Sequence, residues 1–136
     1  MRIMSHYKAR VPIETLVGQT FARVTGSADD DEVCFYRNAD DTKPAYKMLH
    51  DQDCCENVTL HALDNDLSVL EGTPIVSAEE SSNSDQDKPS EYAESWTWTF
   101  YRFQTARGGL VMRWLGESNG CYSEGVDLID MVKAGE

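Results

Sequence analysis

The sequence of 136 residues has no apolar run long enough to cross a membrane as a helix. Its first thirty residues also lack the apolar stretch of a signal peptide. We therefore expect a protein of the cytoplasm that neither spans a membrane nor is exported. A chain of this length can bury one hydrophobic core but not two independent ones. The expectation is a single domain.

Basic side chains are scarce, with 12 Lys and Arg against 24 Asp and Glu and a formal net charge of -12. Such a surface repels the phosphate backbone of nucleic acids, which argues against direct nucleic-acid binding. Solubility explains the acidity, and so does imitation of nucleic acid in the basic groove of another protein. In the second case the acidic run at residues 29–32 would belong to the binding surface.

Cysteine is also scarce, with four residues at positions 34, 54, 55 and 121. Without an export signal, and with two cysteines adjacent and hard to join, reduced thiols are the prediction. The chain lacks a glycine-rich phosphate loop, a serine nucleophile elbow and a paired-histidine metalloprotease helix. The sequence therefore indicates no class of enzyme, and we expect no cofactor.

Alternating side chains at residues 95–105 form the clearest pattern that is present, and they predict a long central strand. One face would hold Trp96, Trp98, Phe100 and Arg102, and the other Thr97, Thr99, Tyr101 and Phe103. Gly108 and Gly109 predict a reverse turn, after which residues 110–115 return antiparallel. Further strands are predicted at residues 20–25, 33–37, 45–49, 57–62, 74–78 and 121–129.

Two short helical turns are predicted, one from Pro12 to the stop at Gly18 and one through Leu67 and Leu70 to Gly72. The fold class is therefore α+β, mostly antiparallel sheet, in a single domain at residues 12–130. Residues 1–11 are predicted to be a mobile lead-in, and residues 131–136 a C-terminal tail. Residues 79–92 are acidic with almost no apolar content, which is typical of a flexible loop.

One cluster of reactive side chains has the ligand types that zinc binds, histidine nitrogen and cysteine sulfur. Its members are His50, Cys54, Cys55 and His61. However, zinc thiolates usually come from cysteines with two residues between them, and neighbours on an extended chain point to opposite sides. The other interpretation is that one cysteine packs as a small apolar group while the second is exposed. A thiol enzyme would need folding to bring one of the histidines beside a cysteine.

Two arginines stand out against the acidic background, because Arg102 and Arg113 lie on strands that the predicted turn makes neighbours. Flanked by Trp98 and Tyr101, they could clamp a phosphate while a ring stacks on a base. In the competing interpretation the aromatic rings form the core and the arginines pair with surface carboxylates.

Three segments, residues 50–58, 94–101 and 113–120, read HDQDCCENV, ESWTWTFY and RWLGESNG. These three motifs resemble those of a family of small uncharacterised proteins found in bacteriophages and prophages. The resemblance implies an accessory protein that acts inside an infected bacterium. Many such proteins bind rather than catalyse: some sequester nucleotide-derived signals of host defence, and others cover the nucleic-acid groove of a host nuclease.

From these features we expect a non-enzymatic protein that sequesters a small phosphorylated, nucleotide-derived ligand. It would act in the cytoplasm of the infected bacterial host. Arginines would bind phosphate, an aromatic ring would stack on a base, and a polar group after Trp114 would bind hydroxyls. Such a pocket could lie at the interface of a homo-oligomer. The predicted ligand-binding residues are Trp98, Tyr101, Arg102, Arg113, Glu117 and Asn119. The alternatives are an acidic inhibitor of a host defence protein and a zinc or thiol enzyme.

Overall fold

Two sheets make up the fold, and the computed structural model describes residues 6–135. The first sheet has the order β1 (Arg10–Val11), β9 (Asp127–Asp130), β4 (Tyr46–Leu49), β3 (Glu32–Tyr36) and β2 (Arg23–Thr25). The second has the order β5 (Asn57–Leu63), β8 (Gly108–Ser118), β7 (Ser95–Thr105) and β6 (Ile75–Asn83). Neighbouring strands in both sheets are antiparallel, which confirms the predicted sheet type.

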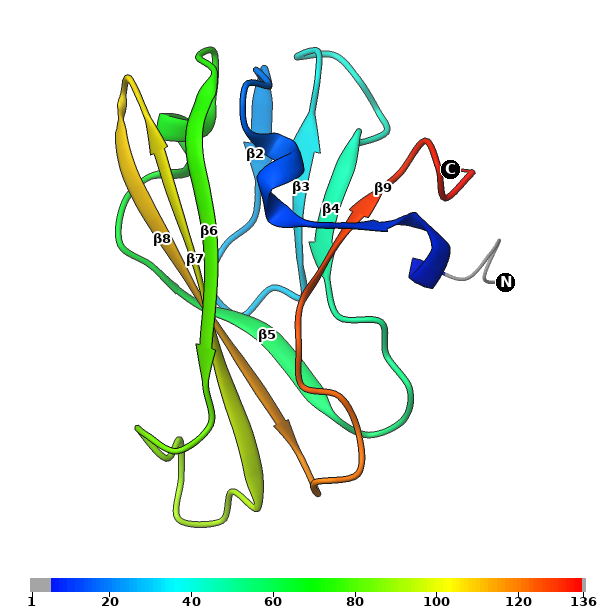
Figure 1. The fold of residues 1–136 in the computed structure, drawn as a ribbon, viewed down its shortest axis with the longest axis vertical. Helices are drawn as coiled ribbons and strands as arrows, with labels where there is room; N and C mark the ends of the chain where they lie inside the picture. The colour runs from blue at the N-terminus through cyan, green and yellow to red at the C-terminus, as the bar shows by residue number, and fades with distance from the viewer. Residues whose placement is uncertain (1–5, 136) are drawn as a thin grey trace.

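The core lies between the two sheets, which Figure 1 shows side by side. The first sheet contributes Phe35 and Met48, and the second contributes Tyr101 and Trp114. Phe21 packs among the first group, with its ring centre 5.3 Å from that of Phe35. Burial of these large side chains is the main force that holds the sheets together.

The strand predicted at residues 95–105 is β7, and its two faces separate as the alternation predicts. Tyr101 and Phe103 are buried against the core, whereas Trp98 and Phe100 lie on the outer face. The return strand β8 pairs with it in register, so that Arg113 lies opposite Phe100. The hairpin of β3 and β4 also agrees with the prediction.

Three short 3₁₀ turns, η1 (His6–Ala9), η2 (Ile13–Leu16) and η3 (Leu67–Leu70), are the helical elements of residues 6–135. The α+β assignment is therefore wrong, although the two turns predicted lie where expected. η2 and η3 have only four residues each between extended residues, too few to propagate an α-helix. None of these turns is long and apolar enough to cross a membrane.

Main-chain hydrogen bonds also join the two sheets along one side. The Gly18 amide donates to the carbonyl of Ile75 at 2.7 Å, and the Ile75 amide donates to Gln19 at 3.0 Å. The Gly72 amide donates to Phe21 at 2.8 Å. Gly18 and Gly72 have positive φ angles of 85° and 74°, which suit glycine. The two predicted turns thus connect the sheets.

A second main-chain connection between the sheets involves the acidic run at residues 29–32, which leads into β3. The Asp29 amide donates to the carbonyl of Leu60 in β5 at 2.7 Å, and the Leu60 amide donates to Asp30 at 2.8 Å. The backbone of this run therefore holds the edge of the second sheet, while its first three side chains are exposed.

Several predicted boundaries differ in the structure: the strands predicted at residues 20–25 and 121–129 correspond to the shorter β2 and β9, and the acidic loop and the N-terminal lead-in also differ. Residues 79–83 continue strand β6 instead of belonging to the acidic loop, because their main chain pairs with β7 from Glu79 opposite Arg102 onward. Their polar side chains hide the strand, since β6 is an edge strand and such strands often carry charge. Residues 10 and 11 form β1 beside β9, whereas residues 1–5 of the predicted lead-in lie outside the described residues.

Gly116 of β8 lies where another segment approaches it most closely. A Cβ atom there would be 2.2 Å from the main-chain oxygen of Glu124. We expect Gly116→Ala to lower the free energy of unfolding by at least about 1–3 kcal/mol, because backbone must shift to relieve the overlap. Urea denaturation would measure the loss.

Gly125→Ala is the matched control for this substitution. A Cβ atom at Gly125 would be 3.7 Å from the Ser123 hydroxyl, an ordinary contact. Equal stability losses for the two variants would contradict the close approach at Gly116.

Candidate functional site

The outer face of the second sheet carries cations stacked on aromatic rings. The guanidinium carbon of Arg113 lies 3.9 Å from the centre of the Trp98 ring and 6.0 Å from that of Phe100. The corresponding carbon of Arg102 lies 5.3 Å from the Phe100 ring. The predicted neighbourhood of the two arginines is therefore present, with Phe100 between them. Such contacts hold a guanidinium over a ring face.

His61 joins this face through an irregularity in β5. Leu60 pairs with Trp114 and Ala62 pairs with Arg113, so His61 is the extra residue of a β-bulge. Its ring meets that of Trp98 edge-on, with 5.1 Å between the centres. A bulge bends its strand, interrupts the pairing locally and re-aims a side chain.

Residues 84–94 connect β6 to β7 and fold back over the same face. The indole nitrogen of Trp98 donates to the main-chain oxygen of Asp87 at 2.8 Å, and that of Trp96 donates to Gln86 at 3.0 Å. Trp98 is only 3% exposed as a result, although it lies outside the core. Lys88 from this connection lies 5.9 Å from the centre of the Trp96 ring.

These side chains line a pocket of about 610 Å³ between the connection and the sheet. Arg113, Lys88 and His61 supply its basic groups, and Asp87 and Glu117 supply its carboxylates. The Nη2 atom of Arg113 is 3.8 Å from a carboxylate oxygen of Asp87, whose side chain is 71% exposed. The buried Nε atom of Arg113 has no hydrogen-bond partner within residues 6–135. The pocket can therefore accept an anionic group beside Arg113.

The predicted ligand-binding residues are divided among several places. Trp98, Arg113 and Glu117 line the pocket together. Asn119 lies apart in a second hollow of about 300 Å³, which shares Glu117 with the pocket. Arg102 is on the same face but outside the pocket, where it donates to the Ser81 hydroxyl at 2.7 Å.

Tyr101 is turned away from all of these residues. Its side chain is buried on the core face, and its hydroxyl donates to the main-chain oxygen of Val126 at 3.1 Å. Burial raises the pKa of Tyr101, and the nearby Glu80 carboxylate adds to the rise. The predicted stacking of Tyr101 on a ligand is not compatible with this position.

The four candidate zinc ligands do not come together. The ring of His50 is held between Gly125 and Glu56, His61 on β5 packs against Trp98, and Cys54 and Cys55 have exposed side chains further along the connection that holds His50. Within residues 6–135 there is no group of three or more His, Cys, Asp or Glu side chains that could hold a metal ion. The zinc alternative therefore lacks a site in the described part of the chain.

His50 and Glu56 instead form a buried pair. Their side chains are 4% and 0% exposed, and Nε2 of His50 is 2.7 Å from Oε2 of Glu56. Nδ1 of His50 is 2.7 Å from the main-chain oxygen of Gly125. The amides of Asp53 and Cys54 donate to the same carboxylate at 2.9 and 2.8 Å. The His50 hydrogen bond, aided by these amides, lowers the pKa of Glu56 to about 2.

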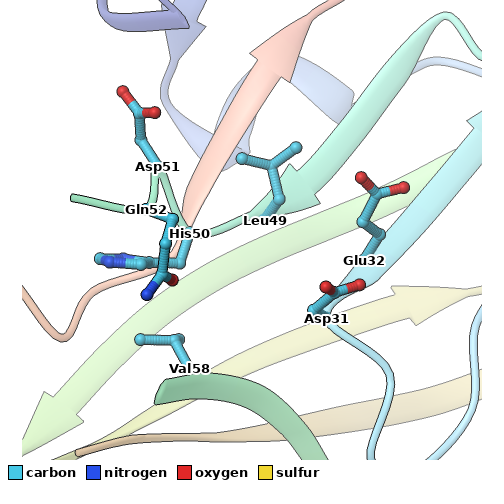
Figure 2. Close-up of a pocket in the computed structure, with 7 residues that line it drawn as sticks. All are labelled: Asp31, Glu32, Leu49, His50, Asp51, Gln52 and Val58. Atoms are coloured by element: carbon cyan, nitrogen blue, oxygen red, sulfur yellow. The ribbon is translucent and has the colours of Figure 1, made fainter. Parts of the chain in front are cut away.

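An acidic hollow of about 350 Å³ adjoins this pair (Figure 2). Asp31 and Glu32 lie on one side of it, and His50 and Asp51 lie on the other. Glu32 also forms an ion pair with Lys47 at 3.5 Å. The sequence shows the acidic run but not the hollow, because residues 31–32 and 49–52 meet only in the folded chain. Its charge suits a cationic partner.

Comparison with known protein families identifies one that matches this chain. Residues 14–128 match the model of a domain of unknown function, DUF7448. The chain belongs to this family. The matched region includes the pocket beside Arg113, the buried His50–Glu56 pair and the acidic hollow. Comparisons with curated proteins and with solved structures found no match.

The lowered pKa of Glu56 predicts how stability depends on pH. Because the pKa falls from 4.5 to about 2 on folding, the carboxylate adds stability that is complete above pH 4.5 and lost as the pH falls to about 2. The free energy of unfolding should therefore fall more steeply over this window in the wild type than in Glu56→Gln. Urea denaturation at a series of pH values measures both slopes.

Glu91→Gln, in the exposed connection before β7, is the control and should keep the wild-type slope. If Glu56→Gln also keeps that slope, the buried pair does not stabilise the ionised carboxylate.

Proposed function

We propose that the protein binds a small phosphorylated ligand, derived from a nucleotide, in the pocket beside Arg113. The observation that most supports this proposal is the position of the Arg113 guanidinium and its contacts. Its central carbon lies over the Trp98 ring, 3.9 Å from the ring centre, and it borders the pocket, yet its carboxylate neighbour is 3.8 Å away and largely exposed. A pre-positioned arginine with unused donors is suited to bidentate binding of phosphate.

The charges around Arg113 favour an anion at this point of an otherwise acidic surface. Lys88 and His61 line the same pocket, whereas the whole chain has a net charge of -12. Asp87 partly neutralises Arg113, but among residues 6–135 its contacts are a hydrogen bond to its main-chain oxygen and this one long ion pair. A phosphate offers more negative charge and more acceptor oxygens than the Asp87 carboxylate that it would displace.

The role of Trp98 in this proposal is to support Arg113. Its buried ring has the guanidinium on it and the edge of His61 against it, so stacking on a base would require one of them to leave. Glu117 and His61 are then the groups that would hydrogen-bond a sugar or base, while Arg113 and Lys88 bind phosphate.

The resemblance to phage and prophage proteins supports a biological setting for this binding. In that setting the protein sequesters a nucleotide-derived signal of host defence inside an infected bacterium. Capture needs a pocket of matching charge and no reacting group, in agreement with the absence of a catalytic motif from the sequence.

A second candidate function is an acidic inhibitor that occupies the basic groove of a host protein. The carboxylates of Asp31, Glu32 and Asp51 around the hollow in Figure 2 favour it. Binding of that kind would weaken steeply as salt rises, because exposed charges carry it and are screened.

Native mass spectrometry with a mixture of cyclic and linear nucleotides tests the main proposal. We expect the wild type to gain one discrete nucleotide mass. Arg113→Gln should lower the affinity at least about tenfold, because it removes charge-assisted hydrogen bonds to phosphate. Arg102→Gln makes the same change of charge on the same face but outside the pocket, and it should bind as the wild type does.

Asp87→Asn completes the set of variants, because it removes the internal competitor and should tighten binding of the same nucleotide. Equal losses for Arg113→Gln and Arg102→Gln would show nonspecific attraction to positive charge. A wild type that ignores every nucleotide would contradict the proposal and favour the acidic inhibitor.

A further inference from the structure

Cys54 and Cys55 are adjacent, exposed, and directed to the same side of the chain. Their sulfur atoms are 2.9 Å apart, and neither forms a disulfide. An extended chain would direct neighbouring side chains to opposite sides. Here the two residues lie in the turn between β4 and β5, and this turn brings the thiols together.

The turn is fixed by hydrogen bonds to side chains at each of its ends. The Cys54 amide donates to the Glu56 carboxylate at 2.8 Å, and the Gln52 side chain donates to the main-chain oxygen of Cys54 at 3.2 Å. Glu56 is itself held by His50. The buried His50–Glu56 pair therefore fixes the turn that brings the two thiols together.

The surroundings distinguish the two sulfur atoms. A hydrogen bond with Cys54 raises the pKa of the Cys55 thiol, and a hydrogen bond with Cys54 also raises the pKa of Tyr122. The raised pKa of Cys55 means that this thiol loses its proton less readily than an ordinary cysteine. This difference favours Cys54 as the attacking atom of the pair, 2.9 Å from the Cys55 sulfur.

We propose that Cys54 and Cys55 form a two-electron redox site that closes to a disulfide on reaction with a low-molecular-weight disulfide such as glutathione disulfide. The Cys54 thiolate attacks one sulfur of glutathione disulfide, which forms a mixed disulfide and releases one glutathione thiolate. Cys55 then loses its proton to that thiolate and attacks the Cys54 sulfur, expelling the second glutathione as a thiolate, which takes from solvent the proton that Cys54 released on ionising. Two protein thiols lose two electrons, and one glutathione disulfide becomes two glutathione thiols.

The ring that results is strained, which makes the reaction reversible. Neighbouring Cα atoms across a trans peptide are about 3.8 Å apart, below the usual disulfide range of about 4.4–6.8 Å. Strained and exposed disulfides have more oxidising potentials than structural ones, and they belong to the labile, regulatory class. Closure would also strain the Cys54 amide hydrogen bond to Glu56 and so alter this turn.

The other two thiols are poorer partners. Cys34 is buried in β3, and burial raises its pKa, with a further rise from Glu32. Cys121 is exposed and next to Tyr122 in sequence, so an experiment must separate it from the pair. The 136-residue chain with Cys34→Ala and Cys121→Ser retains two cysteines, Cys54 and Cys55.

Intact mass spectrometry of this two-thiol protein, after incubation with glutathione disulfide, tests the proposal. We expect a monomer whose mass is lower by two hydrogen atoms, with no glutathione retained, and excess reduced glutathione should restore the starting mass. Adding Cys55→Ser should trap the mixed disulfide, seen as one retained glutathione on Cys54. Circular dichroism verifies that each variant is folded.

The proposal fails if the two-thiol protein keeps glutathione on both cysteines, remains fully reduced, or forms a disulfide-linked dimer. It also fails if the variant with Cys55→Ser retains no glutathione, because Cys54 would then not be the attacking sulfur. Closure that excess reduced glutathione does not reverse would contradict the strained ring.

Discussion

One buried imidazole connects the two places where the chain crosses between the sheets. The chain leaves the first sheet after β4 and enters the second at β5, and it returns from β8 to β9. His50 lies in the first crossing and bonds Glu56 of the same crossing and Gly125 of the second. Both ring nitrogens face acceptors, so both hydrogen bonds form when each nitrogen carries a proton.

This constraint determines what lies around it. Glu56 holds the amides of Asp53 and Cys54, which shapes the turn that carries the adjacent thiols. The acidic hollow of Figure 2 has His50 in its wall. A buried pair of this kind costs desolvation, and its value lies in fixing one arrangement of the segments that it joins.

The pocket beside Arg113 does not depend on the His50–Glu56 pair, because it lies on the outer face of the second sheet. There the sheet supplies a rigid floor, and residues 84–94 fold back over it through hydrogen bonds from the indoles of Trp96 and Trp98. A rigid floor with a covering connection is a common way to hold a ligand. Arg113 is fixed to the floor, whereas Asp87 and Lys88 belong to the cover.

Much of the sheet structure could be predicted, because a period of two places side chains on faces without reference to the rest of the chain. That is why β7, the antiparallel return of β8 and the hairpin of β3 and β4 agree with expectation, although the turn before β8 lies at residues 106–107 and not at the predicted Gly108 and Gly109. The pattern could not show which face of β7 meets the core, since Trp98 and Tyr101 are both aromatic. Trp98 is buried by the connection rather than by the core, a contact between distant segments.

The pocket residues also divide into those that the sequence could place together and those that it could not. Arg113, Trp98 and Glu117 could be placed together because they lie on paired strands. His61 was missed because a bulge of one residue leaves no mark in the sequence, and Lys88 because its connection folds back. The short distance between the Cys54 and Cys55 sulfurs depends on the anchored turn, which residue spacing does not reveal.

The most direct test of a ligand in this pocket is a titration followed through the three indole N–H signals in a nitrogen–proton NMR spectrum. Two of them, from Trp96 and Trp98, bond the connection over the pocket, and the third, Trp114, is buried in the core. With a nucleotide that binds, the first two signals should shift saturably while that of Trp114 stays in place. If the Trp96 and Trp98 signals remain unmoved across the nucleotide series, the pocket does not bind such ligands.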